Sequence, residues 1–342
     1  MTIITFKPKQ VTKRLISILP PRSRDVLESR FGLGKDKDKL TLEAIGTIYG
    51  ITRERVRQIE GHALSSILKS NLYNEHNQTF LELRDLIDSL GGIVAEDDLL
   101  QSVSNNPETQ NHVYFLLVLG DPFKNKKEDF EFKQRWYIDH ALSEKIHDSI
   151  RKVYKNLSTE DLVSESDIIT NFLGHLKDVS DKYKKDEVIR RWLSLSKKID
   201  KNPLGEWGLS SSSNISLKGM RDYAYLVIRA HGSPLHFSEV ARQIKKMFNK
   251  EAHIATCHNE LIKDKRFILV GRGLYALKEW GYSSGVVRDV IVEILKKNGA
   301  LTKEEVVDLV LKERYVKPNT VIVNLQDTKI FKKDNKNRYS LV

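Results

Sequence analysis

The sequence contains a single cysteine among its 342 residues, Cys257. One thiol forms no internal disulfide, which excludes the disulfide-stapled domains of secreted proteins. No apolar run approaches 18 residues, so we expect no transmembrane helix and no membrane partner. The N-terminal stretch MTIITFKPKQ lacks the long apolar segment and the cleavage site of a signal peptide. These absences together predict a cytoplasmic protein.

Clusters of catalytic or metal-binding side chains are scarce as well. In the stretch HIATCH, His253 and Cys257 lie four residues apart on an expected helix, with His258 beside them. That spacing offers two metal ligands, but no third or fourth ligand accompanies it, so we expect a structural role. The GRG of residues 271–273 lacks a phosphate-loop pattern and indicates a hairpin turn. We find no nucleophile beside a base, and we expect no enzyme, no metal and no cofactor.

What the chain does contain is charge, unevenly distributed. Apolar residues make up 40% and charged residues 30%, which is enough to bury several small cores. The net charge of +11 is the sum of +7 over residues 1–70, −6 over 71–216, +6 over 217–284 and +4 over 285–342. Basic segments favour polyanions through phosphate contacts and counterion release. The same charge also serves solubility, so charge alone leaves both interpretations open.

The first segment has the pattern of short helices. The stretch PRSRDVLESRFGL places apolar residues at helical spacing between two prolines and two glycines. Thr41 is placed to cap a helix over about residues 42–49, which Gly50 would end. Thr52 is placed to cap the next helix, with Glu54 in its first turn. Two helices joined by a tight turn with glycine predict a helix-turn-helix.

A loose repeat follows residue 75. Each copy combines helices with a polar hairpin, and an aromatic residue closes each hairpin at spacings of 71, 68 and 64 residues: Trp136, Trp207, Tyr275 and Tyr339. This near-constant unit is typical of a winged helix-turn-helix; four unrelated α+β segments are the alternative. We therefore expect a mainly α fold with small β wings, in which an N-terminal helix-turn-helix precedes tandem winged helix-turn-helix domains. The expected domains are residues 1–74, 75–142, 143–216, 217–284 and 285–342.

The helix after Thr52 divides into two faces at about 100° per residue. Val56, Ile59 and Ala63 fall on one arc, which we expect to be buried. The opposite arc carries Arg53, Glu54, Arg57 and Gln58. In a helix-turn-helix the start of the second helix meets base edges in the major groove, where arginine pairs with guanine, glutamine with adenine and glutamate with cytosine. An ordinary solvated helix face is the alternative.

A family resemblance favours the DNA interpretation. The stretch LPPRSRDVLESRFGL followed by LTLEAIGTIYGITRERVRQIEGHAL closely resembles region 4 of sigma-70 family transcription initiation factors, over about residues 15–70. In that family this region binds the −35 promoter element and packs on the flap of the RNA polymerase β subunit. The resemblance implies base contacts by Arg53, Glu54, Arg57 and Gln58. Backbone contacts are expected from Thr52, Arg55 and Lys69.

The resemblance has a limit. Fewer than 20 residues precede the matching stretch, and nothing after it resembles the part of the family that melts the −10 element. We therefore expect that this chain does not open a promoter by itself.

A second resemblance lies at about residues 217–282. The stretches MRDYAYLVIRAHGSPLHFSEVARQIKKMF and RFILVGRGLYALKEWGY resemble a HARE-HTH domain, a winged-helix module. The resemblance implies phosphate contacts by Arg242, Lys245 and Lys246 on helix faces and by Arg272 in the wing. A solvated basic face is the alternative for these four side chains.

The sequence thus predicts a bacterial, nucleoid-associated transcription regulator that binds double-stranded DNA at promoter-type sites. The acidic middle, residues 75–216, is expected to space the basic ends or to contact protein, because its charge disfavours phosphate. Two other functions stay open. One is an accessory protein of RNA polymerase that docks on the β flap. The other is the DNA-recognition component of a nuclease or defence system.

Overall fold

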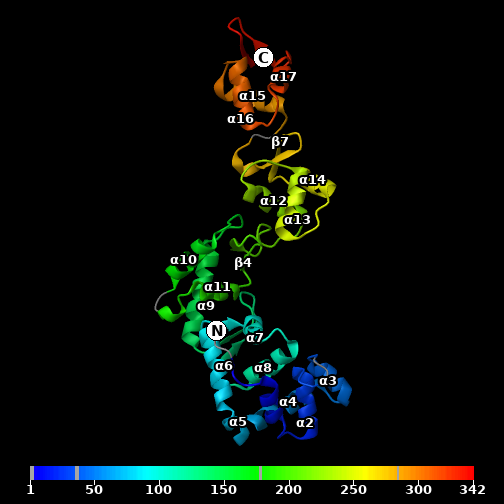
Figure 1. Cartoon of the computed structure of the whole chain (residues 1–342), viewed down its shortest axis with the longest axis vertical. Helices are drawn as coiled ribbons and strands as arrows, with labels where there is room; N and C mark the ends of the chain where they lie inside the picture. Colours follow the sequence, from blue (N-terminus) through cyan, green and yellow to red (C-terminus); the bar gives the residue numbers. More distant parts are fainter. Residues whose placement is uncertain (1–3, 35–37, 177–178, 283–284) are drawn as a thin grey trace. The chain divides into compact units, whose positions relative to one another are not determined.

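The computed structural model describes residues 4–34, 38–176, 179–282 and 285–342. Within these ranges helices predominate and the strands form small sheets, which confirms a mainly α fold with small β wings (Figure 1). The chain divides into two compact units: Met1–Asp200 with Trp207–Ser210, and Lys201–Glu206 with Ser211–Val342. The expected boundary at residue 284 and the first three residues of the N-terminal stretch lie outside the described residues.

The first unit begins with a head of four helices: α1 (Pro8–Ile16), α2 (Pro21–Phe31), α3 (Leu42–Tyr49) and α4 (Arg53–Leu68). The expected caps are in place. Thr41 Oγ1 accepts a hydrogen bond from Ala44 N at 3.1 Å, and Thr52 Oγ1 accepts one from Arg55 N at 3.2 Å. Gly50 ends α3 in the left-handed region, with φ at 63°, where a residue with a Cβ is disfavoured. Helices α3 and α4 therefore form the expected helix-turn-helix.

The head shares a core with the helices and strands that follow it: α5 (Asn71–Glu75), α6 (Asn77–Ser89), β1 (Ile93–Ala95), α7 (Glu96–Val103), α8 (Pro107–Leu119), β2 (Lys124–Lys126) and β3 (Arg135–Tyr137). Leu15 and Phe31 of the head belong to the same buried cluster as Phe80 and Phe115. The strands form an antiparallel sheet in the order β1-β3-β2, with Trp136 in its central strand. Apolar burial on both sides thus fixes the head against the first sheet-bearing module.

A second core closes the first unit. It is built on α9 (His140–Asn156), α10 (Glu165–His175), the 3-10 turn η1 (Asp181–Tyr183), α11 (Asp186–Ser194), β4 (Ile199–Lys201) and β5 (Trp207–Leu209). Trp192 is fully buried in this cluster beside Phe172 and Ile189. Trp207, on β5, exchanges two backbone hydrogen bonds with Val163 at 2.8 Å each. The aromatic residues expected in the first two hairpins therefore both lie in strands.

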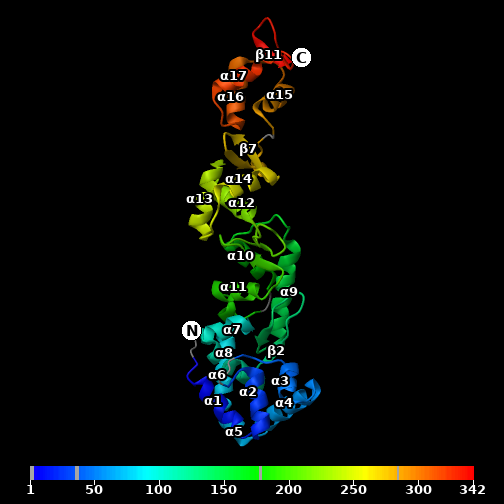
Figure 2. The ribbon, with the colours of Figure 1, turned by 90° about the vertical axis from the view of Figure 1, so that its right-hand side faces the viewer.

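The second unit repeats one order of elements twice. The first copy consists of α12 (Met220–His231), β6 (Leu235–His236), α13 (Phe237–Phe248), α14 (Ile254–Lys263), β7 (Phe267–Gly271), β8 (Leu274–Leu277) and the 3-10 turn η2 (Lys278–Trp280). The second consists of α15 (Val287–Asn298), β9 (Leu301–Thr302), α16 (Lys303–Glu313), α17 (Pro318–Leu325), β10 (Phe331–Lys333) and β11 (Arg338–Leu341) (Figure 2). In both copies the last strand of the hairpin, β8 or β11, is the central strand of the sheet. Tyr275 and Tyr339 lie in these central strands, which confirms the tandem winged-helix pattern.

Candidate nucleic-acid interface

Helix α4 presents the two faces that its sequence predicts. Val56 is fully buried in a small cluster with Val26 and Ile45, while Ile59 is half-buried against it. Ala63 is buried in the larger core of the head. The opposite face is exposed and carries Arg53, Glu54, Arg57 and Gln58. Burial of the apolar arc thus leaves all four candidate base-contacting side chains at the surface.

Two pairs of side chains organise this exposed face. Arg57 donates from Nε to Glu54 Oε2 at 2.9 Å and from Nη2 to Glu54 Oε1 at 2.7 Å. The hydrogen bond from Arg57 lowers the pKa of Glu54, and the same bond raises the pKa of Arg57. Arg55 Nη1 donates to Gln58 Oε1 at 3.0 Å. Without DNA, the donors that would contact bases are therefore engaged with acceptors on the same helix.

A glycine that the sequence analysis did not single out sets the approach of α3 to α4. A Cβ built on Gly46 would lie 2.6 Å from the carbonyl oxygen of Ile51 in the turn. Gly46 O in turn accepts a hydrogen bond from Ile51 N at 2.9 Å. Real Cβ atoms do not come this close to a backbone oxygen, so the turn requires glycine at this position. The signal in the sequence was a glycine inside an otherwise apolar helix.

The expected phosphate contacts of α4 lie at both of its ends. Thr52 and Arg55 are exposed at its N-terminus. Lys69 is the C-terminal cap of the same helix and is also exposed. At 1.5 Å per residue, Thr52 and Lys69 are separated by about 25 Å along the helix. The structure therefore groups Thr52 and Arg55 with the base-contacting residues and places Lys69 apart from them.

The four basic residues of the third repeat are all exposed. On α13, Arg242 forms an ion pair with Glu239, and Lys245 forms one with Glu251 at 2.7 Å. Lys246 follows on the last turn of the same helix. Arg272 occupies the turn between β7 and β8. Three of the four thus share one helix, while Arg272 lies at the tip of the hairpin.

The HIATCH residues do not converge. Cys257 is fully buried, and burial raises the pKa of its thiol to about 11. His258 stacks on Phe237 with ring centroids 4.2 Å apart, whereas His253 is exposed just before α14. Among the residues that the structure describes, no group of three or more His, Cys, Asp or Glu side chains could hold a metal ion. The histidine and cysteine side chains of this stretch therefore serve packing and the surface.

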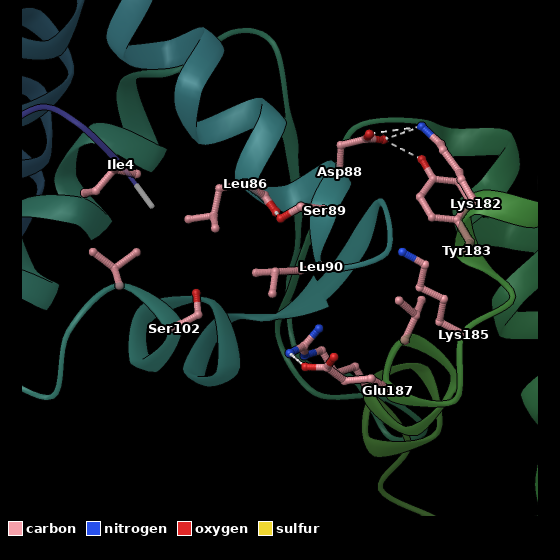
Figure 3. Close-up of a pocket in the computed structure, with 13 residues that line it drawn as sticks. Ile4, Leu86, Asp88, Ser89, Leu90, Ser102, Lys182, Tyr183, Lys185 and Glu187 are labelled. Atoms are coloured by element: carbon pink, nitrogen blue, oxygen red, sulfur yellow. Dashed lines mark hydrogen bonds and ion pairs between the residues drawn. The ribbon is translucent and has the colours of Figure 1, made fainter. Parts of the chain in front are cut away.

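A pocket of about 610 Å³ lies in the first unit (Figure 3). Its polar part centres on Asp88 of α6, which accepts hydrogen bonds from Lys182 Nζ at 2.9 and 3.0 Å and from the hydroxyl of Tyr183. Burial by itself raises the pKa of Asp88, but these hydrogen bonds outweigh it and lower the pKa. Leu86 and Leu90 form much of its apolar wall. The pocket is therefore a seam in which a paired carboxylate fastens α6 to the η1 turn.

Comparison with known proteins assigns two of these surfaces. Residues 15–68 match the family model of sigma-70, region 4. Residues 219–280 match the model of the HARE-HTH family, a restriction endonuclease HTH domain that also takes its name from ASXL. Both segments agree with the resemblances seen in the sequence, and both are helix-turn-helix domains. The region 4 match begins in α1 and ends with the last residue of α4, so it contains the whole exposed arc.

Relatives extend the first match. The chain is 48% identical over 59 residues to the RNA polymerase sigma factor SigA of Nostoc sp., which covers 17% of this chain and 15% of that protein. It is 40% identical over 76 residues to the RNA polymerase sigma factor RpoD of Neisseria gonorrhoeae, 22% of this chain and 12% of that protein. The chloroplastic RNA polymerase sigma factor sigF of Arabidopsis thaliana is 42% identical over 64 residues, covering 19% and 11%. The chain thus spans less than a sixth of the length of these relatives.

The region 4-like segment gives this chain a sigma-factor-like DNA-binding role. Its helix-turn-helix, its exposed basic and amide side chains and its relatives all agree on that role. Among the described residues, no helix combines the length and the apolar character needed to cross a membrane.

Proposed function

We propose that this chain is a bacterial transcription regulator that recognises promoter-type duplex DNA through α4. The observation that carries the proposal is the exposed arc of Arg53, Glu54, Arg57 and Gln58 on the second helix of a helix-turn-helix that matches sigma-70 region 4. The first two turns of α4 would enter the major groove, where arginine pairs with guanine and glutamine with adenine. Thr52 and Arg55 would contact the adjacent phosphates.

The free chain is organised for this exchange. Arg57 and Glu54 satisfy each other in solution, so binding replaces an intrahelical pair with contacts to bases. A base pair that offers acceptors to Arg57 and a donor to Glu54 restores both sets of hydrogen bonds. A mismatched base pair leaves a charged group without a partner in the groove, which costs free energy. Specificity would therefore come from this pair acting together.

We further propose that the chain has five modules with boundaries near residues 74, 142, 216 and 284. The matched HARE-HTH module would supply additional phosphate contacts through Arg242, Lys245, Lys246 and Arg272. Arg242 and Lys245 would exchange their glutamate partners for phosphates. Several DNA-binding modules on one chain raise the overall affinity through effective concentration. No catalytic step enters this function.

The decisive experiment combines a selection from random oligonucleotides with substitution of Arg57. The full chain selects its preferred duplex, and binding is then measured for the wild type and for Arg57→Ala. We expect a loss of roughly 1–3 kcal/mol on the selected duplex and a much smaller loss on random DNA. Arg84→Ala on α6 is the control, because Arg84 is an exposed arginine that also lies beside an acid. Equal losses on both duplexes would exclude base contacts by Arg57.

A second candidate function follows from the relatives, which are named RNA polymerase sigma factors. In this alternative the head docks on the β flap of the polymerase core, and DNA contact is secondary. The test is retention of polymerase by the full chain in nuclease-treated lysate. Retained polymerase together with no sequence preference in the selection would favour this function over the first.

The HARE-HTH family takes part of its name from a restriction endonuclease domain, which supports a third candidate. The chain would then recognise DNA on behalf of a nuclease or defence system. Neighbouring genes that encode a nuclease would support this candidate.

A further inference from the structure

The last helix of the second unit, α17, is a short helix without any charged residue. Its sequence is PNTVIVNL, and its buried side consists of Val321 and Leu325, which pack in the C-terminal core. Asn319 and Val323 lie four residues apart on the opposite side and are exposed, with Thr320 exposed beside them. The exposed face of α17 therefore offers one amide, one hydroxyl and the methyl groups of valine and threonine.

These groups match the major-groove edge of an A·T base pair. An asparagine amide pairs bidentately with the N6 and N7 positions of adenine, and side-chain methyl groups pack on the methyl of thymine. An uncharged helix has no long-range attraction to DNA, so a surface of this kind needs positive charge beside it. Phosphate contacts supply most of the affinity in protein–DNA complexes.

The β10–β11 hairpin carries that charge. Four basic side chains are exposed on it: Lys332, Lys333, Lys336 and Arg338. Its one acidic residue, Asp334, is occupied by the turn, because its carboxylate accepts from the backbone N–H groups of Lys336 and Arg338 at 2.8 Å each. Asn337 adopts φ of 60°, a conformation that asparagine tolerates well. The tip is therefore a tightly bonded turn with an excess of positive charge.

One core fixes the helix and the hairpin to each other. Phe331 of β10 is buried in the same cluster as Val321 and Leu325 of α17. The other strand of the hairpin, β11, pairs with β9, which leads directly into α16. The relative position of amide and lysines is thus set by packed side chains and by strand pairing.

The corresponding parts of the preceding module differ. Its third helix, α14, exposes Ile254 and Ile262. Its hairpin turn carries one basic residue, Arg272, and Val270 at the end of β7 accepts a backbone hydrogen bond from Tyr315 at 2.8 Å. That hairpin edge is therefore partly covered, whereas the β10–β11 hairpin presents a longer and more basic turn.

We propose that α17 and the β10–β11 hairpin form a second duplex-DNA-binding surface, in which Asn319 contacts adenine and Lys332 and Lys336 contact phosphates. This surface lies outside both segments that match family models. It is separate from the α4 surface of the proposed function, so the chain would hold DNA through two heads.

The first test measures phosphate contacts with the full chain on a random-sequence DNA duplex. The double substitution Lys332→Ala, Lys336→Ala is expected to reduce the slope of log affinity against log salt by about 1.8, because each lost phosphate contact contributes about 0.9. The control is Lys152→Ala, Lys155→Ala on α9 of the first unit, which removes the same charge from an exposed helix in the acidic middle. An unchanged slope in the hairpin variant, or an equal reduction in the control, would overturn the proposal. So would a larger loss on an RNA duplex of the same sequence.

The second test isolates base contacts. A selection with the full Arg57→Ala chain, whose α4 surface is weakened, is expected to enrich an A·T-containing site. Asn319→Ala should abolish that enrichment without changing the salt slope. Asn319→Asp keeps the shape of the side chain and suits the first turn of a helix, so it preserves folding while removing the amide donor. Enrichment that survives both substitutions would overturn base contact by Asn319. A failed Arg57 experiment, by contrast, leaves the slope measurement on the hairpin unaffected.

Discussion

Arg57 and Glu54 hold each other by two parallel hydrogen bonds, 2.9 and 2.7 Å long, across one turn of the exposed face of α4. The bidentate geometry keeps the guanidinium in one orientation and occupies the donors that guanine would accept. Random DNA must therefore compete with a carboxylate for Arg57, while a matching site satisfies both residues. The pair acts as a filter against non-specific contact.

Removing the charge of Glu54 should weaken that filter. We expect Glu54→Gln to tighten binding to random duplex DNA and to steepen its salt dependence by up to about one, because Arg57 becomes available to a phosphate. Preference for the selected site over random DNA should fall. Affinities of both duplexes over a salt series provide the measurement. Glu75→Gln on α5 removes an equal charge elsewhere in the first unit and should leave the preference intact; an unaltered preference in Glu54→Gln would contradict the filter.

The turn of the helix-turn-helix should be sensitive to a single methyl group. Gly46→Ala places a Cβ 2.6 Å from Ile51 O, so we expect a loss of about 1–3 kcal/mol in the free energy of unfolding. Gly61→Ala on α4 is the matched control, because no described atom lies within 4 Å of a Cβ built there. This control should gain about 0.5–1 kcal/mol through helix propensity. Denaturant unfolding of both variants decides the point, and equal effects would exclude a special role for Gly46.

The buried pair of Arg135 and His147 should make stability depend on pH. Arg135 Nε donates to His147 Nε2 at 2.8 Å, which requires that nitrogen to be unprotonated. Burial, with Arg135 beside it, lowers the pKa of His147 to about 4. An unfolded chain has the ordinary histidine pKa near 6.5, so it binds the proton more readily than the folded chain between these values. The contribution is fully present above about pH 6.5 and is lost as the pH falls to 4, up to about 3 kcal/mol.

His147→Gln separates this effect from that of the carboxylates. The glutamine oxygen can accept from Arg135 but does not titrate near pH 5. We expect the variant to lose less stability than the wild type between pH 6.5 and 4, as measured by denaturant unfolding at several pH values. Parallel curves for the two proteins would rule out a contribution from His147.

The only thiol of the chain should report on opening of the second unit. Cys257 is buried and its pKa is raised to about 11, so its reactive thiolate is scarce and shielded at pH 8. We expect alkylation of the native chain to be much slower than alkylation in denaturant, with Cys257→Ala as the blank. Similar rates in both conditions would show that the α14 core opens readily.

Much of the local structure could be predicted from the residues. Thr41, Gly50 and Thr52 fixed the ends of α3 and α4, because caps and left-handed glycines act over three or four neighbouring residues. The apolar rhythm of Val56 and Ala63 predicted which side of α4 is buried, because helical period and burial follow each other. The four candidate base-contacting residues of α4 were located in this way. That they contact DNA stays a prediction.

Other features depended on packing between distant segments. The sequence alone did not indicate that Arg135 is buried against His147, or that Leu15 and Phe31 share a core with Phe80. The hairpin with Lys332 and Lys336 was visible as a hairpin, but its relation to Asn319 arises only when Phe331 and Val321 join one core. Sequence by itself determined the helix ends and faces of this protein, because those follow from interactions within a turn or two. Tertiary structure decided which charged groups are buried, paired or presented together, because that depends on which apolar surfaces meet.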